Sequence, residues 1–128
     1  MKHKKLKLLF LILSILFISC NDKIYLTHNY YLLIFEGNDY FELNYKLDDG
    51  NFIGVLNKKI DRYSYTSDYI YCFNKKDSEY YIIPIKEKIS YFPDDNKIGP
   101  LSKVKFDQFL LNHRLETPIF KVVYENDD

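Results

Sequence analysis

The chain has no alanine and no tryptophan, and it has only four glycines, four prolines and two cysteines among 128 residues. Two cysteines cannot make a disulfide framework, and glycines that never cluster exclude the glycine-rich loops that bind phosphates. Neither sign of charge is in excess, because 18 basic residues balance 18 acidic ones. What the chain has instead is 13 tyrosines and 10 phenylalanines. Both residue types suit a pleated, half-buried surface, so the composition favours a β-rich domain.

The first twenty residues are the most distinctive segment. Four lysines lie within residues 2–7, and residues 8–18 are apolar apart from Ser14. A small residue, Ser19, then precedes Cys20. A basic head, a short apolar core and a small residue are the plan of a secretory signal peptide. With the cysteine that follows, the segment resembles a bacterial lipoprotein signal, which is cut just before a cysteine that carries diacylglycerol. The resemblance implies that residues 1–19 are removed and that Cys20 is lipidated.

Two other interpretations of this leader stay open. An uncleaved membrane anchor would have to cross a hydrocarbon layer of about 30 Å, whereas residues 8–18 span only about 16 Å as a helix. An ordinary signal peptide cut near Ser19 would give plain secretion, with Cys20 incidental. Phe17 stands where the lipoprotein pattern commonly has leucine. We expect the lipoprotein signal, and hence a protein held in the bacterial cell envelope outside the cytoplasm.

Removal of the leader would leave 109 residues, which is enough for one domain. We expect residues 20–23 to be a lipidated tether and residues 24–128 to be a single domain. The four lysines leave with the leader, so 14 basic residues face 18 acidic ones, a net charge of −4. This balance gives no reason to expect nucleic acid or anionic lipid as a partner. Attachment to the membrane would come from the lipid, which anchors stably when two or more chains are present.

From residue 24 onward, turn signals about every eight to twelve residues separate runs that are typical of strands. The clearest strand covers residues 40–47, where Phe41, Leu43, Tyr45 and Leu47 share one face by alternation. Asp48-Asp-Gly-Asn51 then predicts a hairpin that returns through residues 52–56. The other expected strands are residues 30–35, 60–65, 69–73, 80–85, 89–92 and 119–124. The strand at residues 80–85 should end at Pro84 or lie at an edge of the sheet, because proline has no N–H to donate to a neighbouring strand.

One helix is expected, over about residues 102–114. Ser102 can serve as its N-cap, and Leu101 with Phe106 is placed for a hydrophobic staple. Its apolar face would consist of Phe106, Phe109, Leu110 and His113. Pro118 ends any helix before it. The predicted fold is therefore α+β, an antiparallel β-rich single domain with one C-terminal helix packed on the sheet.

Parts of this C-terminal half resemble a known family. Tyr80-Tyr-Ile-Ile83, and after a spacer Gly99-Pro-Leu-Ser102 and Phe106, are similar to the ending of DUF3997, a family of small bacterial proteins of unknown function. The resemblance covers roughly residues 29–115, although Lys103 and Lys105 stand where the family usually has acidic residues. Members are commonly lipoprotein-like, and no activity is established for them. The resemblance implies a fold and a cellular address, and it transfers no site.

Few side chains of the expected domain could carry chemistry. His28 precedes a strand, and His113 shares the apolar face of the helix, where a histidine is more often packed in the core than catalytic. Cys72 lies in an expected strand and would be a small buried apolar group. The nucleophile elbow, the Walker motif, His-Glu-x-x-His and paired zinc cysteines are all missing. We therefore expect no catalytic residue, no cofactor and no metal site.

Three further features could overturn that expectation. Acidic clusters at residues 48–51 and 94–96 lack the late bidentate glutamate of a calcium loop, and we interpret them as turns. Glu42 would gain an acid–base role only if it lay beside His113 in a pocket. A platform for a ligand would need tyrosines gathered on one exposed patch, and the candidates are Tyr40, Tyr63, Tyr65 and Tyr91.

The sequence thus favours a monomeric, non-enzymatic, lipid-anchored envelope protein that binds a protein or peptide partner. An immunity-type lipoprotein that blocks a toxin is one version of this hypothesis. The alternative is a membrane-tethered sugar-binding module or hydrolase, which would use exposed tyrosines and scattered carboxylates. The position of Glu42 relative to His113, and the arrangement of the four tyrosines, distinguish the two.

Overall fold

The computed structural model describes residues 23–34, 39–87 and 96–123, which form two antiparallel sheets and one helix. The four-stranded sheet has the order β1-β2-β3-β4, with the bounds Lys23–Thr27, Tyr30–Leu33, Glu42–Lys46 and Phe52–Leu56. The five-stranded sheet has the order β8-β7-β6-β5-β9, with the bounds Ile98–Leu101, Glu79–Pro84, Tyr69–Asn74, Arg62–Tyr65 and Lys121–Val122. Helix α2 covers Lys103–Asn112 and packs on β7 and β8.

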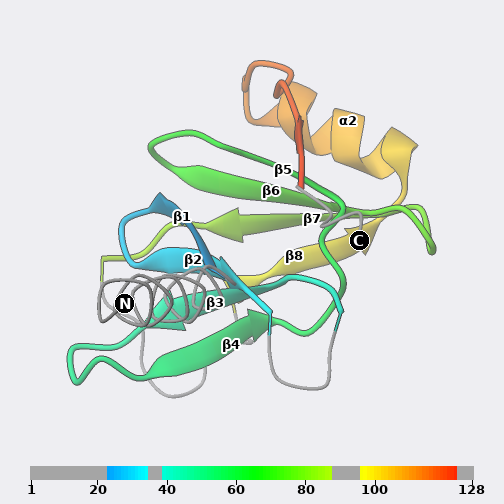
Figure 1. The fold of residues 1–128 in the computed structure, drawn as a ribbon. Coiled ribbons are helices and arrows are strands. Elements are labelled where there is room, and N and C mark those ends of the chain that lie inside the picture. The colour runs from blue at the N-terminus through cyan, green and yellow to red at the C-terminus, as the bar shows by residue number, and fades with distance from the viewer. Residues whose placement is uncertain (1–22, 35–38, 88–95, 124–128) are drawn as a thin grey trace, which may run out of the picture.

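These elements form three layers: the four-stranded sheet, the five-stranded sheet and α2 (Figure 1). The five-stranded sheet is the middle layer, because one of its faces meets the other sheet and the opposite face meets the helix. The predicted α+β fold, with a helix packed on an antiparallel sheet, is confirmed.

The β3–β4 hairpin confirms the prediction made from Asp48-Asp-Gly-Asn51. The backbone N–H of Leu47 donates to the carbonyl of Asn51 at 2.7 Å, and that of Gly50 donates to Leu47 at 2.9 Å. Gly50 has φ +88°, a conformation in which a Cβ is unfavourable. The Asp49 carboxylate accepts the N–H of Asn51 at 2.9 Å, so the acid stabilises the turn.

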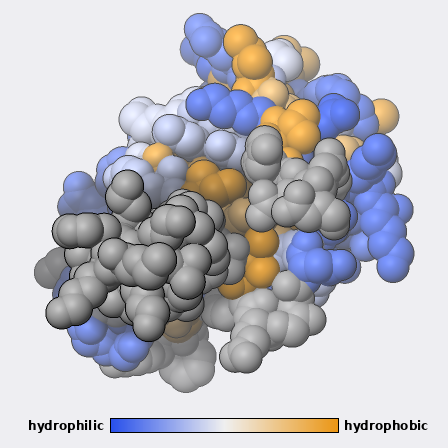
Figure 2. All heavy atoms as spheres, in the orientation of Figure 1, coloured by the Kyte–Doolittle hydropathy of each residue, from blue (hydrophilic) through white to orange (hydrophobic). Residues whose placement is uncertain are grey.

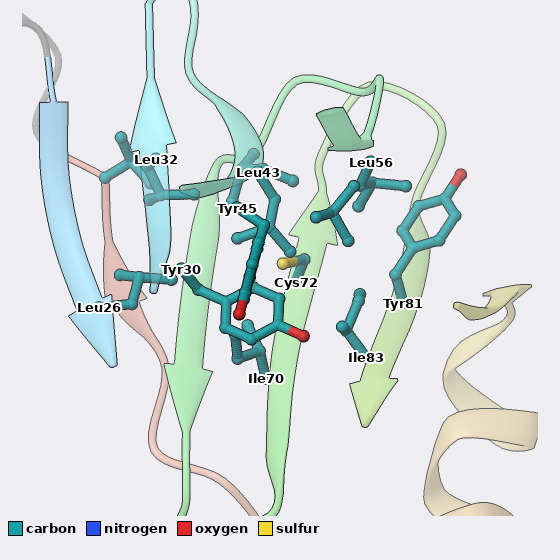
Figure 3. Close-up of a cluster of buried hydrophobic side chains, with 13 residues drawn as sticks. Leu26, Tyr30, Leu32, Leu43, Tyr45, Leu56, Ile70, Cys72, Tyr81 and Ile83 are labelled. Carbon is teal, nitrogen blue, oxygen red and sulfur yellow. The ribbon is translucent and has the colours of Figure 1, made fainter. Parts of the chain in front are cut away.

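The main core lies between the two sheets (Figure 3). The four-stranded sheet contributes residues at alternate strand positions, which include Leu26, Tyr30, Leu32, Leu43 and Tyr45. The five-stranded sheet faces them with residues that include Ile70, Cys72, Tyr81 and Ile83. The rings of Tyr30 and Tyr45 meet edge to face, with centroids 5.1 Å apart. Both hydroxyls reach the segment after β7: Tyr45 donates to the carbonyl of Glu87 at 2.9 Å, and Tyr30 accepts the N–H of Lys86 at 3.3 Å.

A second, aromatic cluster holds α2 to the outer face of the five-stranded sheet. Its buried members are Tyr71, Ile82, Phe106 and Leu110. The predicted N-cap is confirmed, because the Ser102 hydroxyl accepts the N–H of Lys105 at 3.3 Å. Leu101 packs against the same cluster as Phe106, as the predicted staple requires. The prediction for His113 is wrong: this residue is the exposed C-cap, since the helix ends one residue before it.

Other strand predictions have mixed outcomes. β9 confirms a strand in the C-terminal tail, where it pairs with β5. β7 ends at Pro84 as expected, although it is a central strand between β6 and β8. Sequence reasoning did not predict β8, which contains Gly99 and Pro100. β8 is an edge strand that pairs with a neighbour on one side only, so a proline without an N–H donor can be accommodated there. The expected strand at 89–92, the leader and Cys20 lie outside the described residues.

Candidate functional site

Glu42 and His113, whose proximity would have indicated an acid–base role, do not lie together. Glu42 lies in β3 of the four-stranded sheet, whereas His113 caps a helix on the far side of the five-stranded sheet (Figure 1). The imidazole of His113 stacks on the ring of Phe109 with centroids 3.9 Å apart, and its Nδ1 lies 2.9 Å from the Phe109 carbonyl. Because a carbonyl only accepts, Nδ1 carries the proton and donates. The geometry gives His113 a role in ending the helix.

The other candidates for chemistry have structural surroundings. His28 is exposed in the turn between β1 and β2, with Nδ1 3.0 Å from the Thr27 hydroxyl. Cys72 is fully buried in the main core, and burial raises the pKa of its thiol to about 12. The thiol is therefore protonated at neutral pH, which makes it a poor nucleophile and a poor metal ligand. Within residues 23–34, 39–87 and 96–123, no group of three His, Cys, Asp or Glu side chains could hold a metal ion.

The tyrosine platform that the alternative hypothesis requires does not form among Tyr40, Tyr63 and Tyr65, the candidates within the described residues. Tyr63 is half-buried and packs against the main core, and Tyr40 is half-buried ahead of β3. Tyr65 is more exposed, at the end of β5. Tyr91 lies outside the described residues, as does most of the acidic cluster at 94–96.

A different surface stands out, on the C-terminal part of the chain. Four large aliphatic side chains are mostly exposed there: Val104 by 65 %, Leu111 by 78 %, Ile119 by 88 % and Val122 by 72 %. We call these four residues the C-terminal apolar surface. Figure 2 shows apolar side chains among hydrophilic ones in the region of α2.

Val104 and Leu111 are exposed because of their positions on helix α2. Val104 and Leu111 are seven residues apart, so they lie on one side of α2. Phe106 and Leu110 occupy the other side, where they are buried against the five-stranded sheet. The ion pair between Lys103 and Asp107, at 2.7 Å, lies beside this outward side. Docking of the helix therefore uses Phe106 and Leu110 and leaves Val104 and Leu111 exposed to solvent.

Ile119 and Val122 are exposed because of how the segment after α2 packs on the sheet. Phe120 turns inward, where its ring lies 6.1 Å from those of Phe106 and Tyr80, and the neighbouring Ile119 is left exposed. Val123, the residue directly after β9, is buried in the main core, so by alternation Val122 lies on the helix side of the sheet. β9 is one of the two edge strands of the five-stranded sheet, and Figure 1 shows its segment running past the C-terminal end of α2.

Cations lie over aromatic rings next to this surface. Arg62 pairs with Val122 in the β5–β9 register, and its guanidinium lies 5.8 Å from the ring centroid of Phe73. The ammonium group of Lys103 lies 6.0 Å from the centroid of Tyr80. An apolar centre with a charged rim is the usual anatomy of a protein–protein interface. Sequence reasoning missed this surface, although Val104 and Leu111 fall opposite the predicted core face of the helix.

Comparison of the chain with family models, with curated proteins and with solved structures finds no match. The resemblances to DUF3997 and to a lipoprotein signal therefore stay predictions that rest on the residues quoted above. Over the part of the chain that the structure describes, no helix has the length and the apolar character needed to cross a membrane.

Proposed function

We propose that this protein is a small lipid-anchored protein of the bacterial cell envelope that binds a protein or peptide partner and has no catalytic activity. The observation that carries the proposal is the C-terminal apolar surface. Its four aliphatic side chains are each more than 60 % exposed, and under this proposal a partner covers them. The leader that ends at Cys20 supports the anchor, and the separation of Glu42 from His113 supports a non-enzymatic role.

The chemistry of the surface favours a polypeptide partner. Valine, leucine and isoleucine offer no flat aromatic face on which a sugar ring could stack. They suit the apolar side chains of another protein, while Arg62 and Lys103 offer charge at the rim. β9 is an edge strand, and an edge strand can also accept an added strand through its backbone groups. An immunity-type lipoprotein that blocks a toxin remains one form of this function.

The test is site-specific crosslinking of the full-length protein in the membranes of the cells that make it. A photoreactive residue at Leu111 or Ile119 should give a discrete adduct with one partner, identified by mass spectrometry. The matched control is the same photoreactive residue at Lys76, which is exposed in the turn between β6 and β7. Identical adducts from all three positions would mean that the C-terminal apolar surface has no special part in binding.

Affinity for the identified partner gives a second test. Leu111→Ser, Ile119→Ser and Val122→Ser should each weaken binding, and a central contact should cost about tenfold in Kd, which corresponds to about 1.4 kcal/mol. Tyr65→Ser is the control, because Tyr65 is also exposed but lies at the other end of β5 from Arg62. If the control loses as much affinity as the three variants, the binding surface is elsewhere.

A further inference from the structure

The outer face of the four-stranded sheet carries a row of aromatic rings. Tyr25 of β1 contacts Tyr31 of β2 with ring centroids 5.2 Å apart, and Tyr31 contacts Phe52 of β4 with centroids 5.3 Å apart. Tyr25 is 60 % exposed, and the other two rings are half-buried. These three residues, called the aromatic row below, point away from the core because their strand neighbours Leu26, Tyr30 and Leu32 fill it.

Charged side chains flank the aromatic row. Lys23 lies two residues before Tyr25, and Lys46 pairs with Phe52 in the β3–β4 register, so both exposed lysines share this face. Glu42, which is half-buried, adds one acidic group to it. The rings are inclined to one another by 52° and 85° and so make no flat platform for a sugar. Tyrosines between lysines instead suit the interfacial layer of a bilayer, where tyrosine is enriched and lysine reaches the headgroups.

The covalent chain limits how far this face can lie from the membrane. Lys23, the first residue of β1, is three residues after Cys20, so the two Cα atoms are at most about 11 Å apart. The two sheets lie about 10 Å apart, and α2 lies beyond the second one. Lipid on Cys20 would therefore enter the bilayer close to the four-stranded sheet and far from the helix.

We infer that the outer face of the four-stranded sheet, through Tyr25, Tyr31 and Phe52, rests on the lipid surface that holds the acyl chains of Cys20. The inference deepens the proposed function and rests on its lipid anchor. A short tether keeps the aromatic row at an effective concentration in the millimolar range, so weak contacts are enough to orient the domain. The contact does not depend on anionic lipid, because the domain has a net charge of −4 after removal of the leader.

This orientation explains the division of the molecule into two sides. The C-terminal apolar surface lies on α2 and on the helix side of the five-stranded sheet, which is the side opposite the aromatic row (Figure 1). A domain that rests on its four-stranded sheet therefore presents Leu111 and Val122 away from the membrane. In that position they are open to a partner that approaches from outside the lipid surface.

The test uses the full chain, produced in a bacterium that lipidates it and reconstituted into vesicles of phosphatidylethanolamine with a minority of phosphatidylglycerol. An environment-sensitive fluorophore is attached at Lys46→Cys, which leaves the aromatic row intact, and at Gln108→Cys on the outward side of α2 as the matched control. Both positions are exposed, and Cys72 is buried and does not compete for the label. A lipid-borne nitroxide should quench the Lys46→Cys probe several-fold more than the Gln108→Cys probe.

The outcomes separate the anchor from the docking. Tyr25→Ser with Phe52→Ser, in the Lys46→Cys chain, should abolish the difference in quenching while the protein still floats with the vesicles. If the protein floats but the two probes are quenched equally, the anchor holds and the inferred docking is wrong. Persistent quenching in the double variant would also overturn it, since the rings would then be dispensable. If the protein does not float at all, the lipid anchor is wrong and the docking falls with it.

Discussion

Replacement of Phe106 by alanine should test how the helix is held. Phe106 is buried between α2 and the five-stranded sheet. Its ring stacks on Tyr80 with centroids 4.6 Å apart, meets Tyr71 edge to face at 5.8 Å and lies 6.1 Å from Phe120. The residue therefore joins the helix, two strands of the sheet and the C-terminal segment at one point.

The magnitude follows from burial and from these ring pairs. Truncation of a buried phenylalanine typically costs about 3–5 kcal/mol, and each aromatic pair contributes about 0.5–1.5 kcal/mol beyond its buried area. We expect a loss near 5 kcal/mol, which is a large part of the about 5–15 kcal/mol by which a domain is stable. For a domain of this size the loss corresponds to a fall in Tm of about 20 °C.

Phe109→Ala is the matched control on the same helix. The ring of Phe109 is half-buried and meets only Tyr69 of the sheet, edge to face at 6.1 Å, besides stacking on His113. Partial burial and one pair with the sheet predict a loss of about 1–2 kcal/mol. This separates two positions that the sequence pattern treats as equivalent.

The assay is thermal unfolding of residues 21–128, followed by circular dichroism, with Phe106→Leu as a milder variant in case Phe106→Ala does not fold. From the highest Tm to the lowest, the expected order is parent, Phe109→Ala, Phe106→Leu and Phe106→Ala. If Phe106→Ala and Phe109→Ala both melt within about two degrees of the parent, the helix is not docked as described. A reversal of their order would refute the assignment of the inward face.

Cys20→Ala should release the protein from the membrane fraction and abolish labelling by a clickable palmitate analogue; unchanged labelling would contradict lipidation at Cys20. Gly99→Ala should cost about 2 kcal/mol or more in urea unfolding, because Gly99 has φ +132° and a Cβ there would lie 2.7 Å from the carbonyl oxygen of Tyr80. Gly50→Ala, with φ +88° and nothing within 4 Å, should cost only about 1 kcal/mol, and equal losses would argue against the close approach of β8 to β7. Burial raises the pKa of Cys72 to about 12 and raises that of Tyr71 above 10.0, so both groups lose their protons at a lower pH in the unfolded chain than in the folded one. The contribution of the protonated Cys72 to the free energy of unfolding is therefore full below about pH 9 and is lost as the pH rises toward 12. In urea unfolding measured between those pH values, Cys72→Ala should abolish a decrease of about 1.4 kcal/mol per pH unit in the free energy of unfolding.

The elements that the sequence predicted well are those whose signals are local. Alternation over residues 41–47 marks β3, Asp-Gly marks its hairpin, and Ser102 marks the start of α2. Each of these signals acts within a few residues of the chain and needs no knowledge of distant partners. The α+β class followed from them.

What the sequence did not predict depends on distant pairing. β8 contains Gly99 and Pro100, which argue against a strand, and it forms because Tyr80 and Ile82 of β7 offer it a partner. Asn44 falls on the polar face of β3 by alternation, yet it is buried, and its Nδ2 donates to the carbonyl of Glu42 at 3.1 Å. Neither the division into two sheets nor the buried amide can be derived from a period of two.

The outward side of α2 contributes little to folding. Val104 and Leu111 take no part in docking the helix, which Phe106 and Leu110 accomplish. Valine is also a poorer helix former than lysine or glutamate, so intrinsic helix stability does not favour it at an exposed position. Substitution of Leu111 by serine should therefore change stability by only about 0.5 kcal/mol, while Phe106→Ala removes about ten times as much. Neither side chain is needed to dock the helix, so under the proposed function Val104 and Leu111 are free to contact a partner.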